Sequence, residues 1–356
     1  MTALHGSEGR REVGVPVAPE VAGKNNGPRR GSKARPELGR REGTGRTGLI
    51  VSGDDFGASA QVNAGIIEAH RRGVLTSAGL MVTAPAAAEA AAAAKALPSL
   101  DVGLHVVLCN GRSLLPPARL NGMVDGAGRF PRHEVSAGLR YLLDRRVRGA
   151  LGDECRAQLE RGLQMLGRLS HLDGHHNIHL FPVVADVLID LAAEYGVPCI
   201  RLLRESTLTT LALARDRMAL KLVEGVFFRW LTRRARRLMA ERGLFGADWL
   251  FGFHQSGRLS ERYVSGVIAR LPAGAVTEFY FHPAGPAGAA PPDPKRLSEL
   301  KILTSPAFSE ALVRRGVTLT TFAALAAERS AAHPRAAGVS GASEAGSHPE
   351  AQIFFS

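Results

Sequence analysis

Between residues 47 and 328, short apolar runs alternate with segments whose apolar positions recur every three or four residues. The run "TGLIVS" at 47–52 is typical of a buried strand, because it is short and almost wholly apolar. The segment at 59–73 places its apolar residues on one helical face, with Ser59 as a capping residue and Gly73 as a terminator. This first unit therefore predicts a strand followed by a helix.

The same alternation continues along this region. Further apolar runs predict strands at 77–83, 100–108, 170–176, 198–203, 248–253, 275–282 and 317–322. Helical segments are expected at 86–97, 153–168, 184–195, 216–242 and 260–270, with short helices after them and a polar, Pro-containing loop after the third strand. Repeated strand–helix units indicate parallel strands covered by helices, which fits either a (β/α) barrel or a doubly wound sheet. In both folds, functional residues belong at the carboxyl ends of the strands.

The two ends of the chain differ from this region in composition. Residues 1–46 hold ten Lys/Arg and five Glu and show no apolar periodicity, so we expect a disordered basic leader. Residues 330–356 are rich in Ala, Gly and Ser, and we expect a disordered tail there. The leader lacks the apolar stretch of a secretory signal, and no apolar run is long enough to span a bilayer. The prediction is one domain at 47–329.

The charge and the cysteines restrict the partners and the compartment. A net charge of +12 favours anionic partners such as nucleic acid, an anionic membrane surface or acidic substrates. Cys109, Cys155 and Cys199 are scattered without CxxC spacing, so they indicate neither a disulfide framework nor a thiolate zinc site. A reducing, cytoplasmic location is the simplest expectation.

Polar side chains that can bind a metal stand near the ends of four predicted strands. The first strand ends in Asp54 and Asp55, the third carries His105, and a later strand ends in His282. The fourth leads into "HLDGHHNIHLFP" at 171–182, which contains four of the chain's twelve histidines. Carboxylate and imidazole groups that converge from separate strands, with positions left open for water, form the kind of site found in metal-dependent hydrolases.

Each of these residues also has a simpler interpretation. The Asp pair could form a turn that caps the next helix, and His105 could be a hydrogen-bonded core histidine. His282 could end its strand without any further role, and the histidine run could be a surface loop. Taken together these interpretations weaken, because four strands would each have to place such groups at the same end of the sheet. The combined pattern favours a metal site.

Four segments together resemble the YdjC-like carbohydrate deacetylase family, to which the chitooligosaccharide deacetylases belong. They are "IVSGDDFGASAQVNAGIIEAHRRGVLTSAGLMV", "VGLHVVL", "HLDGHHNIHLFP" and "EFYFHPAG", in the family's order over about residues 47–325. The resemblance implies a distorted (β/α), TIM-like barrel and divalent-metal-dependent removal of N-acetyl groups from amino sugars. The branch associated with hopanoid biosynthesis is the most similar, which implies an N-acetylglucosaminyl lipid as substrate.

The resemblance also assigns roles to the first residues of the site. Asp55 matches the family's metal carboxylate, His105 matches a metal-binding histidine, and Asp54 matches the general base. His282 matches the histidine of the family's "HPG" segment, although Ala284 replaces the glycine here, and we assign it as a proton donor to the leaving amine. With an acid and a base on opposite sides of the carbonyl, no serine or cysteine nucleophile is needed, and no GxSxG motif is present.

The third metal ligand comes from the family's "DxHxHxH" stretch. Here that stretch runs from Asp173 to His179, and Asn177 replaces its middle histidine. This leaves His175 and His179, of which we favour His175 as the ligand, with His179 lining the site. The expected cofactor is one divalent ion, Mg or Zn, whose identity imidazole and carboxylate ligands do not decide. The rival functions are a non-catalytic sugar- or metal-binding barrel and a basic nucleic-acid-binding protein.

A long basic segment at 218–243 could serve a partner. Leu220, Val223, Phe227, Trp230 and Leu231 could share one helical face, and five arginines follow within nine residues, at 229, 233, 234, 236 and 237. One interpretation is a barrel helix with solvated arginines; the other is an interfacial helix at an anionic membrane, here the inner membrane face. No nucleic-acid motif is present, so no nucleic acid partner is expected, and a homodimer is left open.

Overall fold

The computed structural model describes residues 46–332 of the chain. The predicted disordered leader and tail lie outside these residues, except for Arg46 and residues 330–332, and they stay predictions. Helix α11 (Phe322–Ala332) continues past the domain boundary expected at 329, so the domain includes residues 330–332. The expected region of alternating strands and helices therefore accounts for nearly all of the described chain.

Eight parallel strands form one sheet around which the described part of the chain is built. They are β1 (Gly48–Phe56), β2 (Ser77–Leu80), β3 (Asp101–Val106), β4 (His171–Gly174), β5 (Cys199–Ile200), β6 (Trp249–Phe251), β7 (Val276–Phe281) and β8 (Thr318–Leu319). The strand order is β5-β4-β3-β2-β1-β7-β6, and β8 pairs with the start of β1. Every paired strand is parallel to its neighbour, as the strand–helix repeat predicted.

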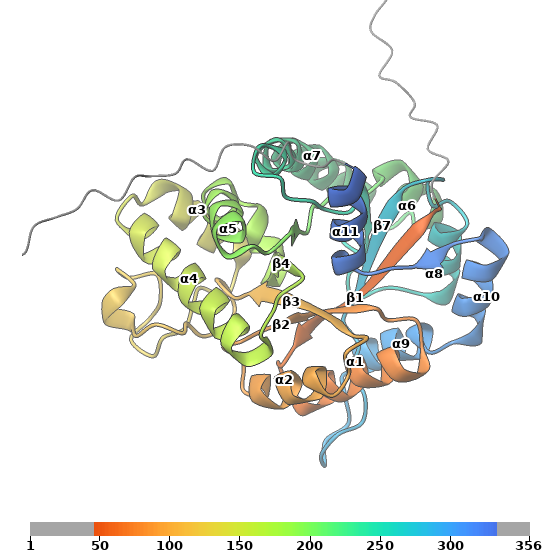
Figure 1. Cartoon of the computed structure of the whole chain (residues 1–356), viewed down its shortest axis with the longest axis horizontal. Coiled ribbons are helices and arrows are strands. Elements are labelled where there is room, and N and C mark those ends of the chain that lie inside the picture. The colour runs from red at the N-terminus through yellow and green to blue at the C-terminus, as the bar shows by residue number, and fades with distance from the viewer. Residues whose placement is uncertain (1–45, 333–356) are drawn as a thin grey trace, which may run out of the picture. The chain divides into compact units, whose positions relative to one another are not determined.

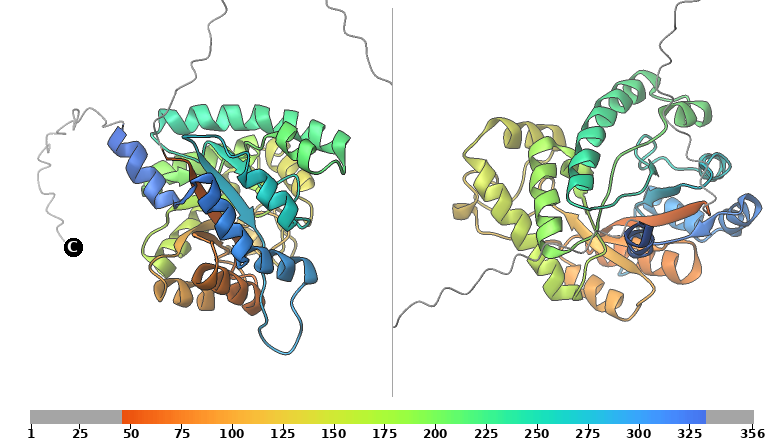
Figure 2. Two further views of the ribbon diagram at one scale, coloured as in Figure 1. Left: turned by 90° about the vertical axis from the view of Figure 1, so that its right-hand side faces the viewer. Right: turned by 45° about the horizontal axis from the view of Figure 1, so that its top comes forward.

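The helices surround this curled sheet (Figures 1 and 2). They are α1 (Ala60–Arg72), α2 (Ala87–Lys95), α3 (Glu134–Leu143), α4 (Val147–Leu166), α5 (Pro182–Tyr195), α6 (Thr207–Leu213), α7 (Met218–Glu241), α8 (Glu261–Ile268), α9 (Pro294–Leu303), α10 (Pro306–Arg315) and α11, with 3₁₀ turns η1 (Pro117–Arg119) and η2 (His175–Leu180). The apolar strand residues and the inner faces of the helices make one large core. None of the helices in the described part combines the length and apolar character that spanning a bilayer requires.

The sheet closes only partly into a barrel, at the gap between β5 and β6. The backbone N–H of Ile200 donates to the carbonyl of Phe245 at 2.9 Å, and that of Leu250 donates to the carbonyl of Arg204 at 3.0 Å. These two bonds join the open edges across a gap that no continuous strand pairing fills. The predicted distorted barrel is therefore confirmed, and the doubly wound alternative is wrong.

Two helices and the length of one strand differ from the prediction. Helix α3 occupies part of the segment expected as a loop, and α6 was not expected. The buried residues of α3 are Ala137, Gly138 and Tyr141, while Val135 and Leu139 point outward. The positions of its large aliphatic residues therefore do not indicate which face is buried. Strand β5 is only two residues long, because the chain leaves the sheet after Ile200. All three cysteines are free and buried, in agreement with their expected lack of a disulfide.

Candidate active site

The carboxyl end of β1 brings two consecutive aspartates to the mouth of the barrel. Successive strand residues normally point to opposite faces of a sheet, so Asp54 and Asp55 should face apart. The register of β1 against β2 shifts between Gly53 and Phe56, and Asp55 has a left-handed φ of 67°. This bulge turns both side chains toward the mouth, where both are almost fully buried. A left-handed non-glycine residue is strained, which is often seen at functional sites.

His105 is held by the strand next to its own. Its Nδ1 lies 2.9 Å from Oδ1 of Asp173 on β4, so the other ring nitrogen, Nε2, faces Oδ1 of Asp55 at 3.5 Å. A Cβ at Gly79 on β2 would lie 3.1 Å from both His105 and Asp173, so the glycine leaves room for this pair inside the barrel. A carboxylate that orients a histidine in this way is typical of metal-binding imidazoles.

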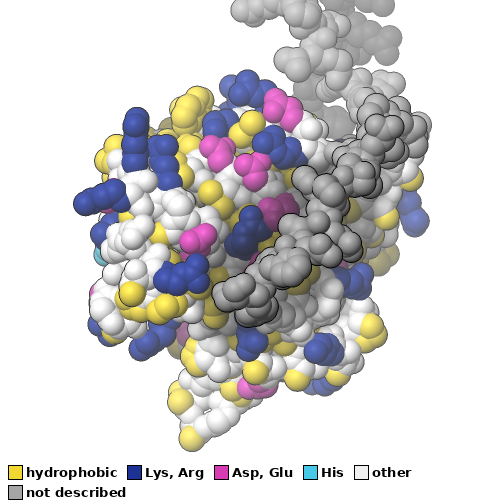
Figure 3. Space-filling view, turned by 60° about the vertical axis from the view of Figure 1, so that its left-hand side comes forward, with side chains coloured by type: hydrophobic (Ala, Val, Ile, Leu, Met, Phe, Trp, Pro, Cys, Tyr) yellow, Lys and Arg dark blue, Asp and Glu magenta, His cyan; other side chains and the backbone are white. Residues whose placement is uncertain are grey.

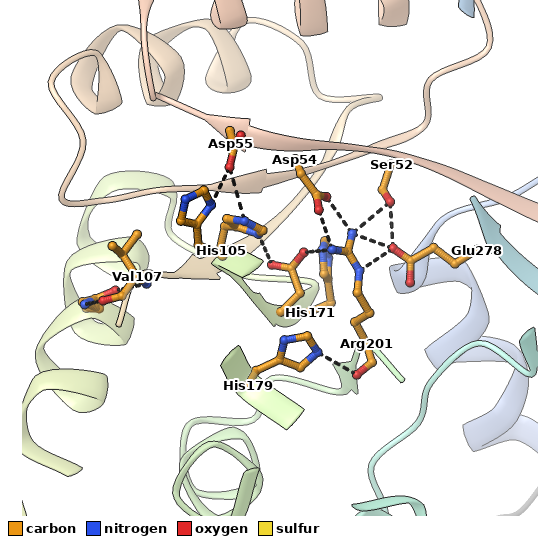
Figure 4. Close-up of polar contacts among 12 residues, drawn as sticks. Ser52, Asp54, Asp55, His105, Val107, His171, His179, Arg201 and Glu278 are labelled. Atoms are coloured by element: carbon orange, nitrogen blue, oxygen red, sulfur yellow. Dashed lines mark hydrogen bonds and ion pairs between the residues drawn. The ribbon is translucent and has the colours of Figure 1, made fainter. Parts of the chain in front are cut away.

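The turn η2 separates the two candidate histidines of the "DGHHNIH" stretch. Residues His176 and Asn177 both adopt left-handed φ near 54°, which folds the chain back after β4. His175 points into the mouth, and its Nδ1 lies 2.8 Å from Oδ1 of Asp55. His179 lies beneath, fully buried, with Nε2 3.2 Å from the backbone carbonyl of Arg201. The structure thus brings His175 to Asp55. His179 is directed away from Asp55, toward the backbone of Arg201 (Figure 4).

Asp55, His105 and His175 converge as a candidate metal centre. One ligand atom from each lies within 4.8 Å of the others. Oδ1 of Asp55 is buried and accepts no hydrogen bond of acceptable geometry, although Nδ1 of His175 is only 2.8 Å away. Two lone-pair atoms that meet without a well-formed hydrogen bond fit a cation between them. The donor set of one carboxylate and two imidazoles also fits a divalent first-row metal or Mg²⁺.

Sequence reasoning missed the residue at the centre of the site, Arg201. Its guanidinium is 1 % exposed and forms ion pairs of 2.7 Å with Asp54, Asp173 and Glu278 (Figure 4). With Asp54 the pairing uses both carboxylate oxygens, each 2.7 Å from a guanidinium nitrogen. Arg201 follows β5 within the run "PCIRLL", where a single arginine has no distinguishing neighbour. Only the fold reveals that three carboxylates surround it.

Arg296 is a second cation that the sequence did not indicate. It lies in the first turn of α9 and pairs with Oδ2 of Asp55. The other oxygen of Asp55, Oδ1, faces the histidines. Its side chain is 31 % exposed, and its Nη1 is buried without a hydrogen bond in the described part of the chain. Arg296 therefore fixes the orientation of Asp55 and keeps one N–H group free beside the cavity.

His282 reaches the site from the end of β7. Its backbone N–H donates to Oε2 of Glu299 at 2.5 Å, and its ring packs edge-on against Tyr280 with centroids 5.6 Å apart. A Cβ at Gly65 of α1 would lie 2.5 Å from Cα of Ala284, so the backbones of α1 and the segment after His282 are in close contact. No hydrogen bond to the ring nitrogens of His282 is found within residues 46–332, which leaves the imidazole available to a ligand.

These residues line a common cavity of about 250 Å³. All five residues predicted for the site, Asp54, Asp55, His105, His175 and His282, contribute to its wall. Its remaining wall is formed by Glu134, Gly174, His176, Asn177, Phe253, Ser256, Tyr280 and Arg296.

The buried carboxylates in and behind the cavity wall favour positively charged groups next to them. Burial would raise the pKa of Asp55, but the adjacent imidazoles of His105 and His175 outweigh burial and hold that pKa well below the usual value. Burial would likewise lower the pKa of His105, yet Asp173 and Asp55 raise it to about 10. For His179 burial is the dominant effect and lowers the pKa to about 4, although Asp173 acts in the opposite direction. A divalent cation at the centre would supply positive charge beside these carboxylates, which is otherwise supplied by the proton on His105.

Comparisons with known proteins identify a family and several relatives that this chain resembles in sequence. Residues 48–314 match the profile of a family described as YdjC-like protein. A carbohydrate deacetylase of Geobacillus stearothermophilus is 35% identical over 278 residues, which cover 77% of this chain and 96% of that protein. A carbohydrate deacetylase of Mus musculus is 33% identical over 303 residues, covering 77% and 93%.

One solved structure has a similar fold along its whole length. It is a candidate cellobiose-phosphate cleavage protein of Enterococcus faecalis V583, with a TM-score of 0.62 and 25% sequence identity. The likeness covers 79% of this chain and 99% of that structure. This likeness supports the partly closed barrel described above.

Proposed function

The chain belongs to the YdjC-like family, and from this we propose that it is a carbohydrate deacetylase, a hydrolase that removes an N-acetyl group from an amino sugar. The observation that carries the proposal is the convergence of Asp55, His105 and His175, with Asp54 beside them in the same cavity. A binding module would need the first three residues but has no use for the additional carboxylate. The names of the relatives at 35% and 33% identity support the same activity.

We assign Asp55, His105 and His175 as the residues that would hold one divalent ion, Mg or Zn. When bound, the ion would supply a Lewis acid that polarises the acetyl carbonyl and acidifies water. Asp173 would keep His105 in the tautomer whose Nε2 is free, because it accepts the hydrogen bond from Nδ1. Arg296 would hold Asp55 from the opposite side.

Asp54 would take the proton from the attacking water. Arg201 fixes the plane of the Asp54 carboxylate through two hydrogen bonds, which suits a base that must meet the water in one orientation. Water acidified by a bound divalent ion would give up this proton more readily, so the assignment of Asp54 as the base goes together with a metal-dependent reaction.

His282 would protonate the leaving amine. An amide nitrogen cannot leave as an anion, so a proton must reach it as the carbon–nitrogen bond breaks. His282 comes from β7 and Asp54 from the adjacent strand β1, and both line the cavity, so an acetamido group between them would have an acid and a base within reach. The products are then acetate and a free amino sugar.

The finer part of the proposal concerns the substrate. From the resemblance to the hopanoid-associated branch, we propose an N-acetylglucosaminyl group carried by a lipid, with the enzyme acting at the cytoplasmic face of the inner membrane. Phe253 supports a substrate with an apolar part, because this aromatic ring lines the cavity and packs against Phe228 of α7, with ring centroids 4.8 Å apart.

The test is acetate release by the purified full-length protein. The protein is stripped with a chelator, reloaded separately with Zn²⁺, Mg²⁺ or Mn²⁺, and incubated with N,N′-diacetylchitobiose and with an N-acetylglucosaminyl hopanoid. We expect metal-dependent acetate release, faster from the lipid-linked sugar. Equal release from the stripped and reloaded proteins would overturn the metal, and equal rates on the two substrates would overturn the lipid preference.

Two ligand variants separate metal loss from misfolding. We expect His105→Ala to lose stoichiometric metal in elemental analysis, and also turnover, because a three-residue site cannot lose one ligand without losing most of its affinity. Because His105 is buried, His175→Asn serves as a second variant at a side chain that is 14% exposed. If both variants fold and retain one equivalent of metal, the ligand assignment is wrong.

A further inference from the structure

Helices α6 and α7 expose an unusual number of large apolar side chains. Leu208 of α6 is 79% exposed, and on α7 Val226 and Trp230 are 74% and 61% exposed. The other apolar side chains exposed on α7 are Met218, Leu220, Leu222, Val223 and Phe227. We call this set the α6–α7 surface. Apolar side chains gathered in this way are rare on a monomeric protein and mark an interaction site.

The buried side of α7 shows that this exposure follows from the rotation of the helix about its own axis. Its buried residues are Lys221, Leu231, Thr232, Ala235 and Met239. Buried Lys221 donates to Asp216 at 2.8 Å and to the carbonyl of Ala214 at 2.9 Å, which fixes the rotation of the first turns. The apolar side chains at 222, 223, 226 and 230 therefore face away from the barrel, although a core-facing helix would bury them.

The charges along α7 divide into paired and unpaired groups. Arg234 pairs with Asp186, and Arg236 lies 3.9 Å from Asp248, so these two arginines bind the helix to the body of the protein. Arg229 and Arg233 are exposed and form no ion pair within the described residues. They stand one turn apart, so the outward side of α7 changes from apolar to basic along its length.

The acidic residues of α7 do not oppose this basic end. Glu224 lies toward the protein, with an oxygen 3.2 Å from Nδ1 of buried His254 and the other 3.8 Å from Arg217. Glu241 lies at the last position of the helix, 3.9 Å from Arg237. The outward stripe formed by Val226, Arg229, Trp230 and Arg233 thus contains no carboxylate.

We propose that the α6–α7 surface docks on an anionic lipid bilayer. The apolar side chains would enter the boundary between headgroups and acyl chains, and Trp230 would sit at the headgroup level, where indole rings are favoured. Arg229 and Arg233 would meet lipid phosphates, which guanidinium groups bind through two parallel hydrogen bonds. Basic charge alone does not mark such a surface, because Lys and Arg also stand out on the face shown in Figure 3. The distinguishing feature is unpaired arginines next to large apolar side chains.

A second copy of the chain fits this surface less well. In a two-fold contact each surface meets its own counterpart. Arg229 and Arg233 would then meet other residues of the same surface, and the outward stripe has no acidic group to compensate for their charge. Burying unpaired like charges is unfavourable, whereas phosphate groups of a membrane supply the missing negative charge.

Docking would also bring the candidate active site close to the lipid, and this step rests on the proposed function. Phe228 of α7 contacts Phe253, which lines the cavity, so the docked helix and the cavity wall are in direct contact. A sugar could therefore enter the cavity while an attached lipid remains in the bilayer.

The experiment measures sedimentation of the full-length chain with vesicles of phosphatidylcholine alone or with 30 mol% phosphatidylglycerol (about a third anionic lipid). We expect binding to the anionic vesicles that falls with added salt. Residues 1–45 are basic and are present in every variant, so the informative quantity is the difference between variants. Arg229→Gln with Arg233→Gln should weaken binding about tenfold or more, since each basic residue near an anionic surface contributes several-fold.

Matched variants make the result specific. Arg71→Gln with Arg161→Gln removes the same charge from exposed positions on α1 and α4, and we expect it to retain most of the binding. Val226→Gln with Trp230→Gln should weaken binding at constant charge, whereas Val313→Gln on α10, which is 80% exposed, should not. Equal binding by all variants would overturn the proposal, as would a wild-type dimer that Val226→Gln with Trp230→Gln converts to a monomer without change in vesicle binding.

These outcomes do not depend on the proposed activity. Vesicle binding without acetate release would support the docking surface and count against the deacetylase. Acetate release from a soluble sugar without a difference in vesicle binding among the variants would support the deacetylase and remove the docking surface.

Discussion

The mouth of the barrel and the α6–α7 surface satisfy their side chains in opposite ways. At the mouth, charged groups are buried but paired: Arg201 alone meets three carboxylates at 2.7 Å. On the α6–α7 surface, apolar groups and the arginines at 229 and 233 are exposed without partners in the described chain. Buried charge persists in a fold only when it is compensated, whereas exposed apolar area persists because another surface can cover it.

The two regions differ in the kind of partner that each would bind. At the mouth, the donor atoms of the proposed metal centre already converge, and Asp173 and Arg296 already hold His105 and Asp55 in place. The α6–α7 surface lacks a partner of molecular size. Substitutions at the mouth should therefore change chemistry and stability strongly, and substitutions on the α6–α7 surface should change association and little else.

The largest expected effect is on turnover, in Asp54→Asn. The amide keeps the shape of the carboxylate but cannot accept the proton of water, and loss of a general base lowers the rate by about 10²–10⁴-fold. Metal content should be unchanged, since Asp55, His105 and His175 remain. Acetate release and elemental analysis on one preparation give both numbers. A rate near that of the wild type would mean that another group activates the water.

The next largest effect is on folding, in Arg201→Met. Methionine fills much of the volume but leaves Asp54, Asp173 and Glu278 buried without their shared cation. Removing one partner of a buried ion pair destabilises a protein by about 3–5 kcal/mol, and three carboxylates lose theirs here. The midpoint of urea unfolding at neutral pH measures the loss. An unchanged midpoint would mean that water solvates the three carboxylates, and that their charge does not need to be balanced by Arg201.

Much of the mouth could be predicted from the sequence, because strand ends of a parallel sheet meet at one edge. That rule brings Asp55 and His105 together without any knowledge of contacts. It could not predict Arg201, which stands in an apolar run and gains its role from carboxylates on three other strands. It also could not predict that a bulge turns both aspartates to one side, since strand alternation implies the opposite.

The helices of the outer layer were harder to predict, since periodicity reveals a face but not what covers it. The segment at 216–242 was correctly expected as a helix, yet of the five apolar residues on its predicted face only Leu231 is buried. The sequence does not indicate helix α3 for a related reason: Val135, Leu139 and Leu143 are exposed, and its buried residues are Ala137, Gly138 and Tyr141. Exposure depends on neighbours far away in the sequence, which a local pattern does not contain.

A smaller effect is expected at the contact that positions His282, in Gly65→Ala. The new Cβ would lie 2.5 Å from Cα and 2.7 Å from N of Ala284, both backbone atoms, so α1 and this segment must separate. Overpacking of this kind costs about 1–3 kcal/mol, and the shift of His282 should lower kcat. Gly149→Ala on α4 is the control, because nothing lies within 4 Å of its Cβ and alanine favours a helix. Equal thermal midpoints for the two variants would contradict the close contact.

The smallest expected effect on stability comes from the α6–α7 surface, in Val226→Gln with Trp230→Gln. Both side chains are more than half exposed, so their replacement removes little buried area, and glutamine is at least as good a helix former as either residue. Changes at such positions usually stay within about 0.5 kcal/mol each, so the urea midpoint should hardly move while vesicle binding falls. The midpoint is to be measured at two protein concentrations. A loss of stability that grows as the wild-type protein is concentrated would mean that a second copy covers these side chains. That result would make the α6–α7 surface resemble the mouth: a region already complete within the protein's own assembly.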